Sequence, residues 1–180
     1  MATINEFKSR MTGGGLRQNQ FRVILPTIPN AINFDTKTFT ILCKATALPE
    51  SNIADVPVSY RGKKAHFAGE KEFSSWTVTV YTDTDFDVRD AFESWSSMIS
   101  NYSTTEGETN IYNYQVDGKI QPLSRGGKVL KTYDMKGIWV RRVGEIQMDY
   151  DTENTIASFE VEFVYDYFQP SINSTDNYLI

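Results

Sequence analysis

The sequence predicts a mainly β domain with one helix and one long hairpin that protrudes from the core. The 180 residues include 11 Phe, 10 Tyr and 3 Trp, and aromatic side chains are typical of pleated sheets. Several segments alternate apolar and polar residues with the period of a strand. Only one segment has a clear helical period. With 40% hydrophobic residues, a chain of this length can bury one core, so we expect residues 1–180 to form a single domain.

Five segments have the alternation or composition of strands. They read "QFRVIL", "FTILCKA", "SSWTVTVYT", "KTYDMKGIWV" and "FEVEFVYDYF", at residues 20–25, 39–45, 74–82, 131–140 and 159–168. In the last segment Phe159, Val161, Phe163 and Tyr165 are expected to face the core. The same alternation places a mostly acidic set on the opposite face of the strand. This set comprises Glu160, Glu162 and Asp166.

The expected helix begins at Asp87, which we predict as its N-cap. Apolar residues then recur at helical spacing and form a stripe suited to packing on a sheet. The stripe consists of Val88, Ala91, Phe92, Trp95, Ile99 and Tyr102. Residues 103–128 are polar, with scattered Tyr and Gly, and no element is predicted there.

Residues 48–73, "LPESNIADVPVSYRGKKAHFAGEKEF", are too long for an ordinary connection between strands. Unstructured connections of this length are uncommon and usually have a function. Val56, Val58 and Tyr60 alternate with other residues, and a polar turn of four residues, 61–64, follows them. We therefore expect a hairpin that needs another surface to lie against.

The two ends of the chain have the character of appendages. Residues 1–15 form a polar arm that ends in three glycines, and residues 169–180 form a mostly polar tail in which Pro170 is expected to stop the preceding strand. Neither a secretory signal nor an apolar run of membrane-spanning length is present in the sequence. We expect a soluble chain made in the cytoplasm.

Composition argues against most kinds of chemistry. Eighteen Lys and Arg against 23 Asp and Glu give a net charge of −5, which disfavours tight binding of nucleic acid or anionic membrane. His66 is the only histidine and Cys43 the only cysteine, so neither a histidine-rich nor a thiolate metal site is expected. Cys43 lies in an apolar segment and is predicted to be a small buried residue. No catalytic set is recognisable, and we expect neither enzymatic activity nor a cofactor.

Four blocks of the sequence, in this order and spacing, resemble the tail tube proteins of T-even-like contractile-tailed bacteriophages. They are "CKATALPESNIADVPV", "AGEKEFSSWTVTVYTD", "AFESWSSM" and "KGIWVRRVGEIQMDYDTENTIASFEVEFVYDYF". The similarity extends from "RQNQFRV" to Phe168 and is weakest over residues 103–128 and after Pro170.

The resemblance implies an antiparallel β-sandwich or partial barrel with one flanking helix. It also implies that six copies close into a ring and that rings stack into a hollow tube inside a contractile sheath. Such a tube carries DNA from the capsid to the host cell. The implied location is the virion, after assembly in the host cytoplasm. The implied partners are other copies of the chain, the tail sheath protein, the tube-initiating proteins of the baseplate and the tail-terminating proteins.

Two sets of residues are predicted to act in such an assembly. The hairpin is expected to contact the adjacent ring through its apolar side chains and its cationic tip. This set comprises Val56, Val58, Tyr60, Arg61, Lys63, Lys64 and Phe67. The acidic set of Glu160, Glu162 and Asp166 is expected to face either the lumen, where it would let DNA slide, or the outer surface.

Two other functions are compatible with the sequence. A tube-initiating paralogue from the baseplate would share the same blocks. A carbohydrate-binding β-sandwich would use Tyr60, Tyr112 and Tyr114 as an aromatic platform. The first would start a tube without extending it, and the second would stay monomeric.

Overall fold

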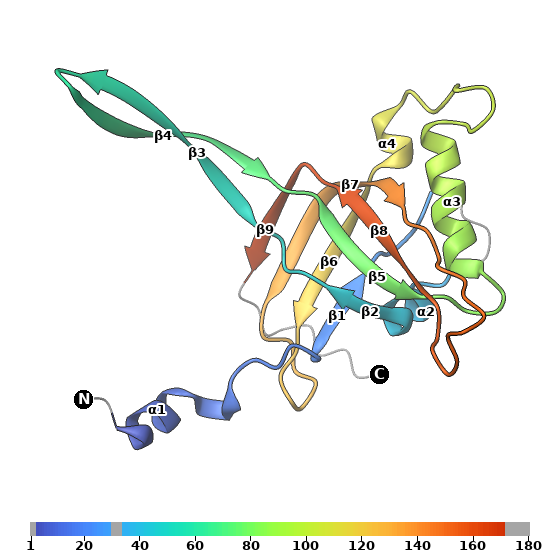
Figure 1. Cartoon of the computed structure of the whole chain (residues 1–180), viewed down its shortest axis with the longest axis horizontal. Helices are drawn as coiled ribbons and strands as arrows, with labels where there is room; N and C mark the ends of the chain where they lie inside the picture. Colours follow the sequence, from blue (N-terminus) through green and yellow to red (C-terminus); the bar gives the residue numbers. More distant parts are fainter. Residues whose placement is uncertain (1–2, 30–33, 172–180) are drawn as a thin grey trace.

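The computed structural model describes residues 3–29 and 34–171. Its main feature is an open, curved, seven-stranded antiparallel sheet in the order β1-β6-β7-β8-β5-β2, with β9 paired to β7 (Figure 1). The strands are β1 Phe21–Ile24, β2 Cys43–Thr46, β5 Trp76–Tyr81, β6 Val116–Pro122, β7 Thr132–Val143, β8 Ser158–Val164 and β9 Tyr167–Ser171. The predicted antiparallel, partial-barrel architecture is confirmed.

A separate two-stranded sheet forms the hairpin, from β3 Ser51–Tyr60 and β4 Lys63–Phe73. The helices are α1 Ile4–Arg10, α2 Thr36–Leu42, α3 Asp87–Ile99 and α4 Ile111–Tyr114, with a short 3₁₀ turn η1 at Thr12–Gly14. The hairpin and α1 both extend away from the body of the molecule, whereas α3 packs beside the sheet (Figure 1).

Aromatic side chains build the core between the sheet and its helices. The ring of Phe92 on α3 meets those of Phe39 and Phe163 edge-on, with centroids 5.6 and 5.7 Å apart. Trp76 stacks on Phe163 at 5.1 Å, and Trp95 lies 6.1 Å from the same ring. Each such pair adds to the free energy gained from burying apolar area.

Alternation in β5 and β8 matches the prediction. Trp76, Val78 and Val80 are buried, and they lie opposite Phe163, Val161 and Phe159 in the register. These six residues form the inner face of the β5–β8 pair. The period-2 pattern therefore fixes which face of this part of the sheet meets the core.

The predicted helix is present as α3, with its apolar stripe buried against the sheet. Its beginning differs from the prediction, because Phe86 occupies the N-cap position in a left-handed conformation with φ 60° and no side chain caps the helix. Asp87 and Asp90 lie in the first turn instead, where carboxylates interact favourably with the helix dipole. The helix ends at Ile99, so Tyr102 lies beyond it and is 72% exposed.

The prediction of a strand over residues 39–45 is only partly right. Residues 36–42 form α2, and the strand β2 begins at Cys43. The Asp35 carboxylate accepts hydrogen bonds from the backbone N–H groups of Lys37 and Thr38 and thereby starts the helix. The helical turn buries Phe39 and leaves Ile41 79% exposed.

The prediction of one strand over residues 159–168 is also wrong. β8 ends at Val164, and the chain bends so that the backbone N–H of Asp166 donates to the Lys136 carbonyl. β9 then pairs with β7 and contains Pro170, which was expected to stop the strand. In the described residues β9 pairs with β7 alone, and such an edge strand tolerates the missing N–H of proline.

Two segments for which no helix or strand was predicted contain regular secondary structure. Residues 103–128 include α4 and β6, a central strand between β1 and β7. The N-terminal arm contains α1, which Thr3 and Glu6 start through reciprocal hydrogen bonds. Of the predicted tail, only residues 169–171 fall within the described part of the chain.

Candidate assembly surfaces

The hairpin is regular along most of its length. β3 and β4 pair from Ser51 with Phe73 to Tyr60 with Lys63. Arg61 and Gly62 form the turn, with φ of 48° and 81°. A two-residue turn with both φ positive suits the right-handed twist of two antiparallel strands. The predicted four-residue turn is therefore too long, since Lys63 and Lys64 belong to β4.

The pairing gathers the apolar residues on one face of the hairpin. Val56 lies opposite Phe67, and Val58 lies opposite Ala65. Tyr60 continues the same face to the tip. We call this set the apolar hairpin face, and it comprises Val56, Val58, Tyr60, Ala65 and Phe67. Its four larger side chains are 46–67% exposed, so within one chain the face does not contribute to a core.

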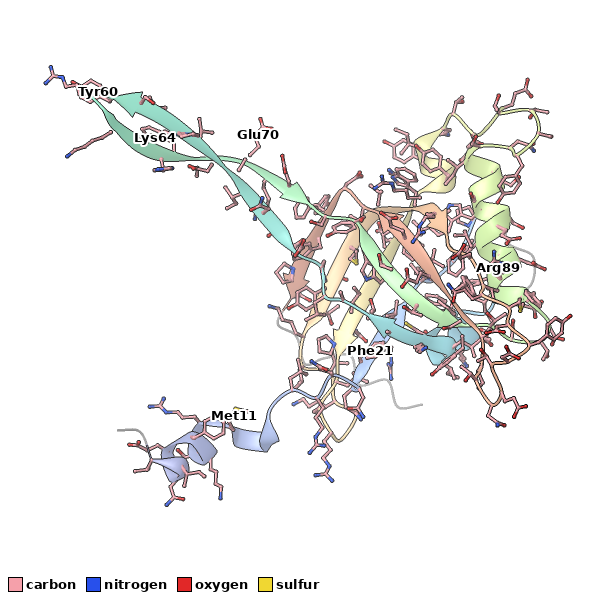
Figure 2. The ribbon with its side chains drawn as sticks, in the orientation of Figure 1. Met11, Phe21, Tyr60, Lys64, Glu70 and Arg89 are labelled. Atoms are coloured by element: carbon pink, nitrogen blue, oxygen red, sulfur yellow. The ribbon has the colours of Figure 1, made fainter. Side chains whose placement is uncertain are left out.

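The cationic residues lie at the end of this face. Arg61 is in the turn, and its guanidinium lies 5.3 Å from the centre of the Tyr60 ring. Lys63 is on the apolar hairpin face opposite Tyr60, and Lys64 points to the other face. Figure 2 shows Tyr60 and Lys64 far from the body of the protein. Six of the seven residues predicted for the hairpin thus lie on this face or in the turn, and Lys64 lies on the opposite face.

The base of the hairpin is fixed to the body. Phe73 packs against Tyr165 and Phe168, with ring centres 5.9 and 5.5 Å apart. The Ser74 hydroxyl donates a hydrogen bond of 2.7 Å to Glu50 Oε1. A shift in register near Ile53 brings the strands so close that a Cβ at Gly69 would lie 2.9 Å from the Ala54 carbonyl oxygen. The direction of the hairpin is therefore set by packed and hydrogen-bonded groups.

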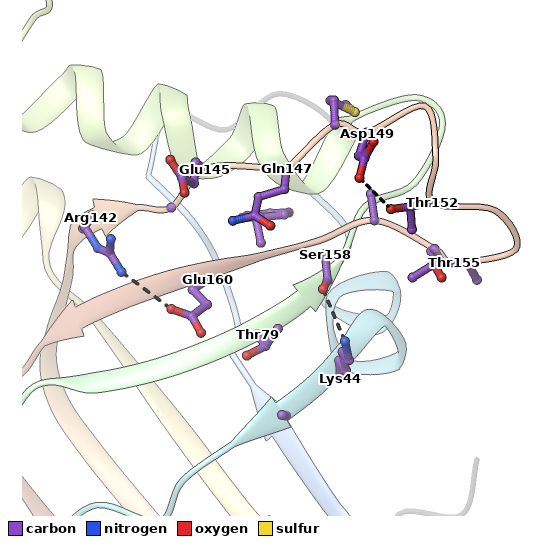
Figure 3. Close-up of a pocket in the computed structure, with 16 residues that line it drawn as sticks. Lys44, Thr79, Arg142, Glu145, Gln147, Asp149, Thr152, Thr155, Ser158 and Glu160 are labelled. Carbon is purple, nitrogen blue, oxygen red and sulfur yellow. Dashed lines mark hydrogen bonds and ion pairs between the residues drawn. The ribbon is translucent and has the colours of Figure 1, made fainter.

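The face of β8 that points away from the core carries Glu160 and Glu162, as alternation requires. Both carboxylates are paired with arginines. Arg141 Nη1 lies 3.2 Å from Glu162 Oε1. Arg142 lies 3.6 Å from Glu160 and 3.7 Å from Glu162 (Figure 3 shows the Arg142–Glu160 pair). The arginines come from β7, the neighbouring strand, so the sequence of β8 alone could not reveal them.

Asp166 does not belong to this row. It lies in the bend between β8 and β9, where its side chain approaches Gly137. Any Cβ at Gly137 would clash with that carboxylate. The acidic face of this strand therefore holds two carboxylates, each with an arginine partner.

A groove of about 900 Å³ lies between residues 144–157 and the outward face of β2, β5 and β8 (Figure 3). Its lining is mixed in charge and includes Lys44, Arg142, Glu145, Asp149 and Glu160. Lys44 Nζ lies 3.4 Å from the Ser158 hydroxyl. No histidine or cysteine lines the groove among the described residues, so it offers no nucleophile with an imidazole base.

Cys43 is partly buried, whereas the sequence predicted a buried residue. Burial raises the pKa of the Cys43 thiol to about 12, which keeps it protonated and weakly reactive at neutral pH. Within residues 3–29 and 34–171, no group of three or more His, Cys, Asp and Glu side chains is placed to hold a metal ion.

The aromatic platform of the carbohydrate-binding alternative is not formed. Tyr60 is at the hairpin tip, whereas Tyr112 and Tyr114 are on α4 at another corner of the molecule (Figure 1). Three rings so far apart cannot stack on one sugar.

Comparison with known proteins identifies the family. A sequence model described as phage tail tube protein matches residues 16–171. The chain belongs to the phage tail tube protein family. Tail tube protein gp19 of Enterobacteria phage T4 is 33% identical over 159 residues, which cover 88% of this chain and 93% of that protein.

Solved structures share the fold of this tail tube family member. The tube-terminating cap of the anti-feeding prophage matches with a TM-score of 0.66 over 88% of this chain and 92% of that one, at 14% identity. A chain of the sheath–tube complex of the PVC extracellular contractile injection system matches with a TM-score of 0.61 over 92% and 97%, also at 14% identity.

Membership of this family places the protein in the virion, as a structural component of a phage tail. Among the described helices, none combines the length and the apolar character needed to span a membrane.

Proposed function

We propose that six copies of this tail tube protein close into a ring, and that rings stack into the tube that conducts DNA from capsid to host cell. The open sheet supports ring closure. Edge strands present unpaired N–H and C=O groups unless another strand covers them. Among the described residues, β1 and β2 end the main path of the sheet, and β9 is a further edge strand. Neighbouring copies would supply the missing contacts at these edges.

The observation that supports the stacking of rings is the protruding hairpin. Its apolar face is exposed in one chain, although burying such side chains is favourable by about 25 cal/mol per Å². Ring contacts and a hydrogen bond join the base to the body, so the hairpin projects in a direction from which it can contact another subunit. We assign it to the adjacent ring, with Val56, Val58, Tyr60 and Phe67 supplying buried area. Arg61, Lys63 and Lys64 would supply charge complementarity.

Tail sheath protein, baseplate tube-initiating proteins and tail-terminating proteins are the proposed partners of the tube. A chain of a sheath–tube complex and a tube-terminating cap share this fold, which supports that assignment. We propose that the face of β8 that carries Glu160 and Glu162 lines the lumen. DNA would move along this face without binding to it.

Shortening the hairpin tests the proposal. Replacing residues 53–69 by a brief Gly-Ser linker should leave the body folded, because the core lies outside this segment. The purified variant should form rings without stacking them. Circular dichroism reports the fold, and negative-stain electron microscopy reports rings and tubes. Tubes of normal length from the shortened protein would exclude the hairpin as the stacking element. If the wild-type protein starts tubes but does not extend them, the tube-initiating alternative would be favoured.

A further inference from the structure

Charge is distributed very unevenly between two parts of this chain. Residues 56–69 hold one arginine and two lysines, Arg61, Lys63 and Lys64, together with His66 and no carboxylate. Residues 144–157 hold four carboxylates and no basic residue, and residues 83–93 hold five carboxylates and one arginine. We call the two acidic segments together the acidic end.

The strands place the acidic end opposite the hairpin. β5 starts close to the hairpin base at Trp76, which pairs with Phe163 of β8. Five residues later β5 reaches Tyr81, which pairs with Ser158, the first residue of β8 after segment 144–157. Segment 83–93 follows directly after β5. Figure 2 shows Arg89, within this end, on the side of the body remote from Tyr60 and Lys64.

The two acidic segments are joined into one surface. The Thr82 N–H donates to the Ala157 carbonyl at 2.9 Å. Arg89 Nη1 donates to the Gly144 carbonyl at 3.0 Å. The Asp149 carboxylate accepts a hydrogen bond of 3.0 Å from the Asp151 N–H. This bond stabilises a turn inside segment 144–157.

The arginine of the acidic end is already occupied. Arg89 Nε lies 2.7 Å from Glu93 Oε1, and the guanidinium lies 5.2 Å from the centre of the Phe159 ring. The charges of Asp85, Asp151 and Glu153 on the exposed surface are therefore not balanced by this arginine.

Apolar side chains stand among these carboxylates. Met148, Tyr150 and Ile156 are 75%, 106% and 66% exposed. A surface that is both acidic and apolar fits a partner that is both basic and apolar. The hairpin has that combination, since its apolar face ends in Lys63 and the turn residue Arg61, and Lys64 lies near the tip on the other face.

We propose that the acidic end of one copy receives the hairpin tip of a second copy in the adjacent ring. This inference rests on the proposed role of the hairpin in stacking and adds the surface that receives it. The hairpin tip and the acidic end lie on opposite sides of the subunit, so the contact between two copies is head-to-tail. The same contact can therefore form at every junction between adjacent rings.

Charge reversal tests the pairing. Variant A carries Arg61→Glu, Lys63→Glu and Lys64→Glu, and variant B carries Asp85→Lys, Asp151→Lys and Glu153→Lys. Variant B leaves intact Asp149, which shapes its segment, and the carboxylates in the first turn of α3. We expect either variant alone to lower the yield of tubes at low salt by about tenfold, which corresponds to about 1.4 kcal/mol. The chain that carries both sets should regain most of the wild-type yield, because attraction is restored with the signs exchanged.

A matched pair of single variants controls for net charge. Glu153→Lys and Glu106→Lys change the charge equally, but Glu106 lies in the segment after α3, outside the acidic end. Only Glu153→Lys should weaken stacking. If variant A blocks stacking while variant B neither blocks it nor rescues variant A, the inference is overturned and the stacking role of the hairpin stands. The acidic end would then be assigned to another partner such as the sheath. If variant A stacks normally, the electrostatic role of the tip fails and the inference fails with it.

Cross-linking covers the case in which variant B does not fold. In a Cys43→Ala background, Ser59→Cys places a thiol near the tip and Glu153→Cys places one at the acidic end. Tubes treated with a short bifunctional maleimide should yield covalent ladders only when both cysteines are present. Intact tubes without ladders would overturn the inference.

Discussion

At the scale of single residues, Arg89 is the best example of a side chain whose role depends on three contacts. It pairs with Glu93, donates to the Gly144 carbonyl and lies over the Phe159 ring. These contacts join α3, the segment after β7 and the start of β8. A close backbone approach adds to the join, because a Cβ at Gly144 would lie 2.7 Å from the Glu160 carbonyl oxygen.

We predict that Arg89→Ala destabilises the fold by about 2 kcal/mol, the range for hydrogen bonds that involve a charged group. The side chain is 19% exposed, so solvent replaces the lost contacts only in part. For a domain of this size the loss corresponds to a fall in Tm of about 4–8 °C. Thermal unfolding followed by circular dichroism measures it, with Arg17→Ala at an exposed position as the control. Equal Tm values for the two variants would contradict the prediction.

At the scale of elements, α2 shows how one cap decides between helix and strand. Residues 39–45 have a composition that is typical of a strand, yet the first four of them complete a helix that starts after Asp35. The Thr40 hydroxyl also donates to the Val23 carbonyl at 2.8 Å, which ties the helix to β1. Tertiary contacts of this kind override local propensity.

The pKa of Asp35 is lowered, chiefly by the hydrogen bond from the Thr38 hydroxyl and then by the N–H groups of Lys37 and Thr38. A carboxyl with a lowered folded-state pKa stabilises the protein above its unfolded pKa, and this contribution is lost as pH falls through the folded pKa. We therefore expect Asp35→Ala to lower Tm at pH 7 and to have a smaller effect at pH 3. Asp35→Asn, which can still accept from the backbone, should retain more stability at pH 7. A Tm difference between wild type and Asp35→Ala that is unchanged by pH would refute this account.

At the scale of the whole molecule, the pairs between β7 and β8 determine how the proposed lumen would meet DNA. Glu160 and Glu162 offset Arg141 and Arg142. Replacing one partner of each pair would leave the arginines unbalanced. A wall with excess positive charge binds phosphates through release of counterions, and this binding weakens as salt rises.

Phage that carry Glu160→Lys and Glu162→Lys should assemble and contract their tails, because these side chains lie outside the core. They should eject DNA more slowly than the wild type, most of all at low salt. Glu160→Gln with Glu162→Gln changes the charge by half as much and should have an intermediate effect. Ejection followed by release of a DNA-binding dye measures the rate. Intact particles that eject at the normal rate would place this face outside the channel.

The sequence by itself determined the class of fold, the strands with clear alternation, α3 and the hairpin. These features depend on local periodicity, which any sheet or helix with one buried face must show. The blocks from 43 to 168 also determined the family. Only the tertiary structure decided what depends on distant partners. The arginines that balance Glu160 and Glu162 come from another strand, and α2 and β9 depend on a cap and on pairing with β7. The acidic end is formed by two segments more than 50 residues apart in the chain. Such residues meet because the strands run antiparallel and share their ends, and the sequence of one segment contains no signal of its neighbour.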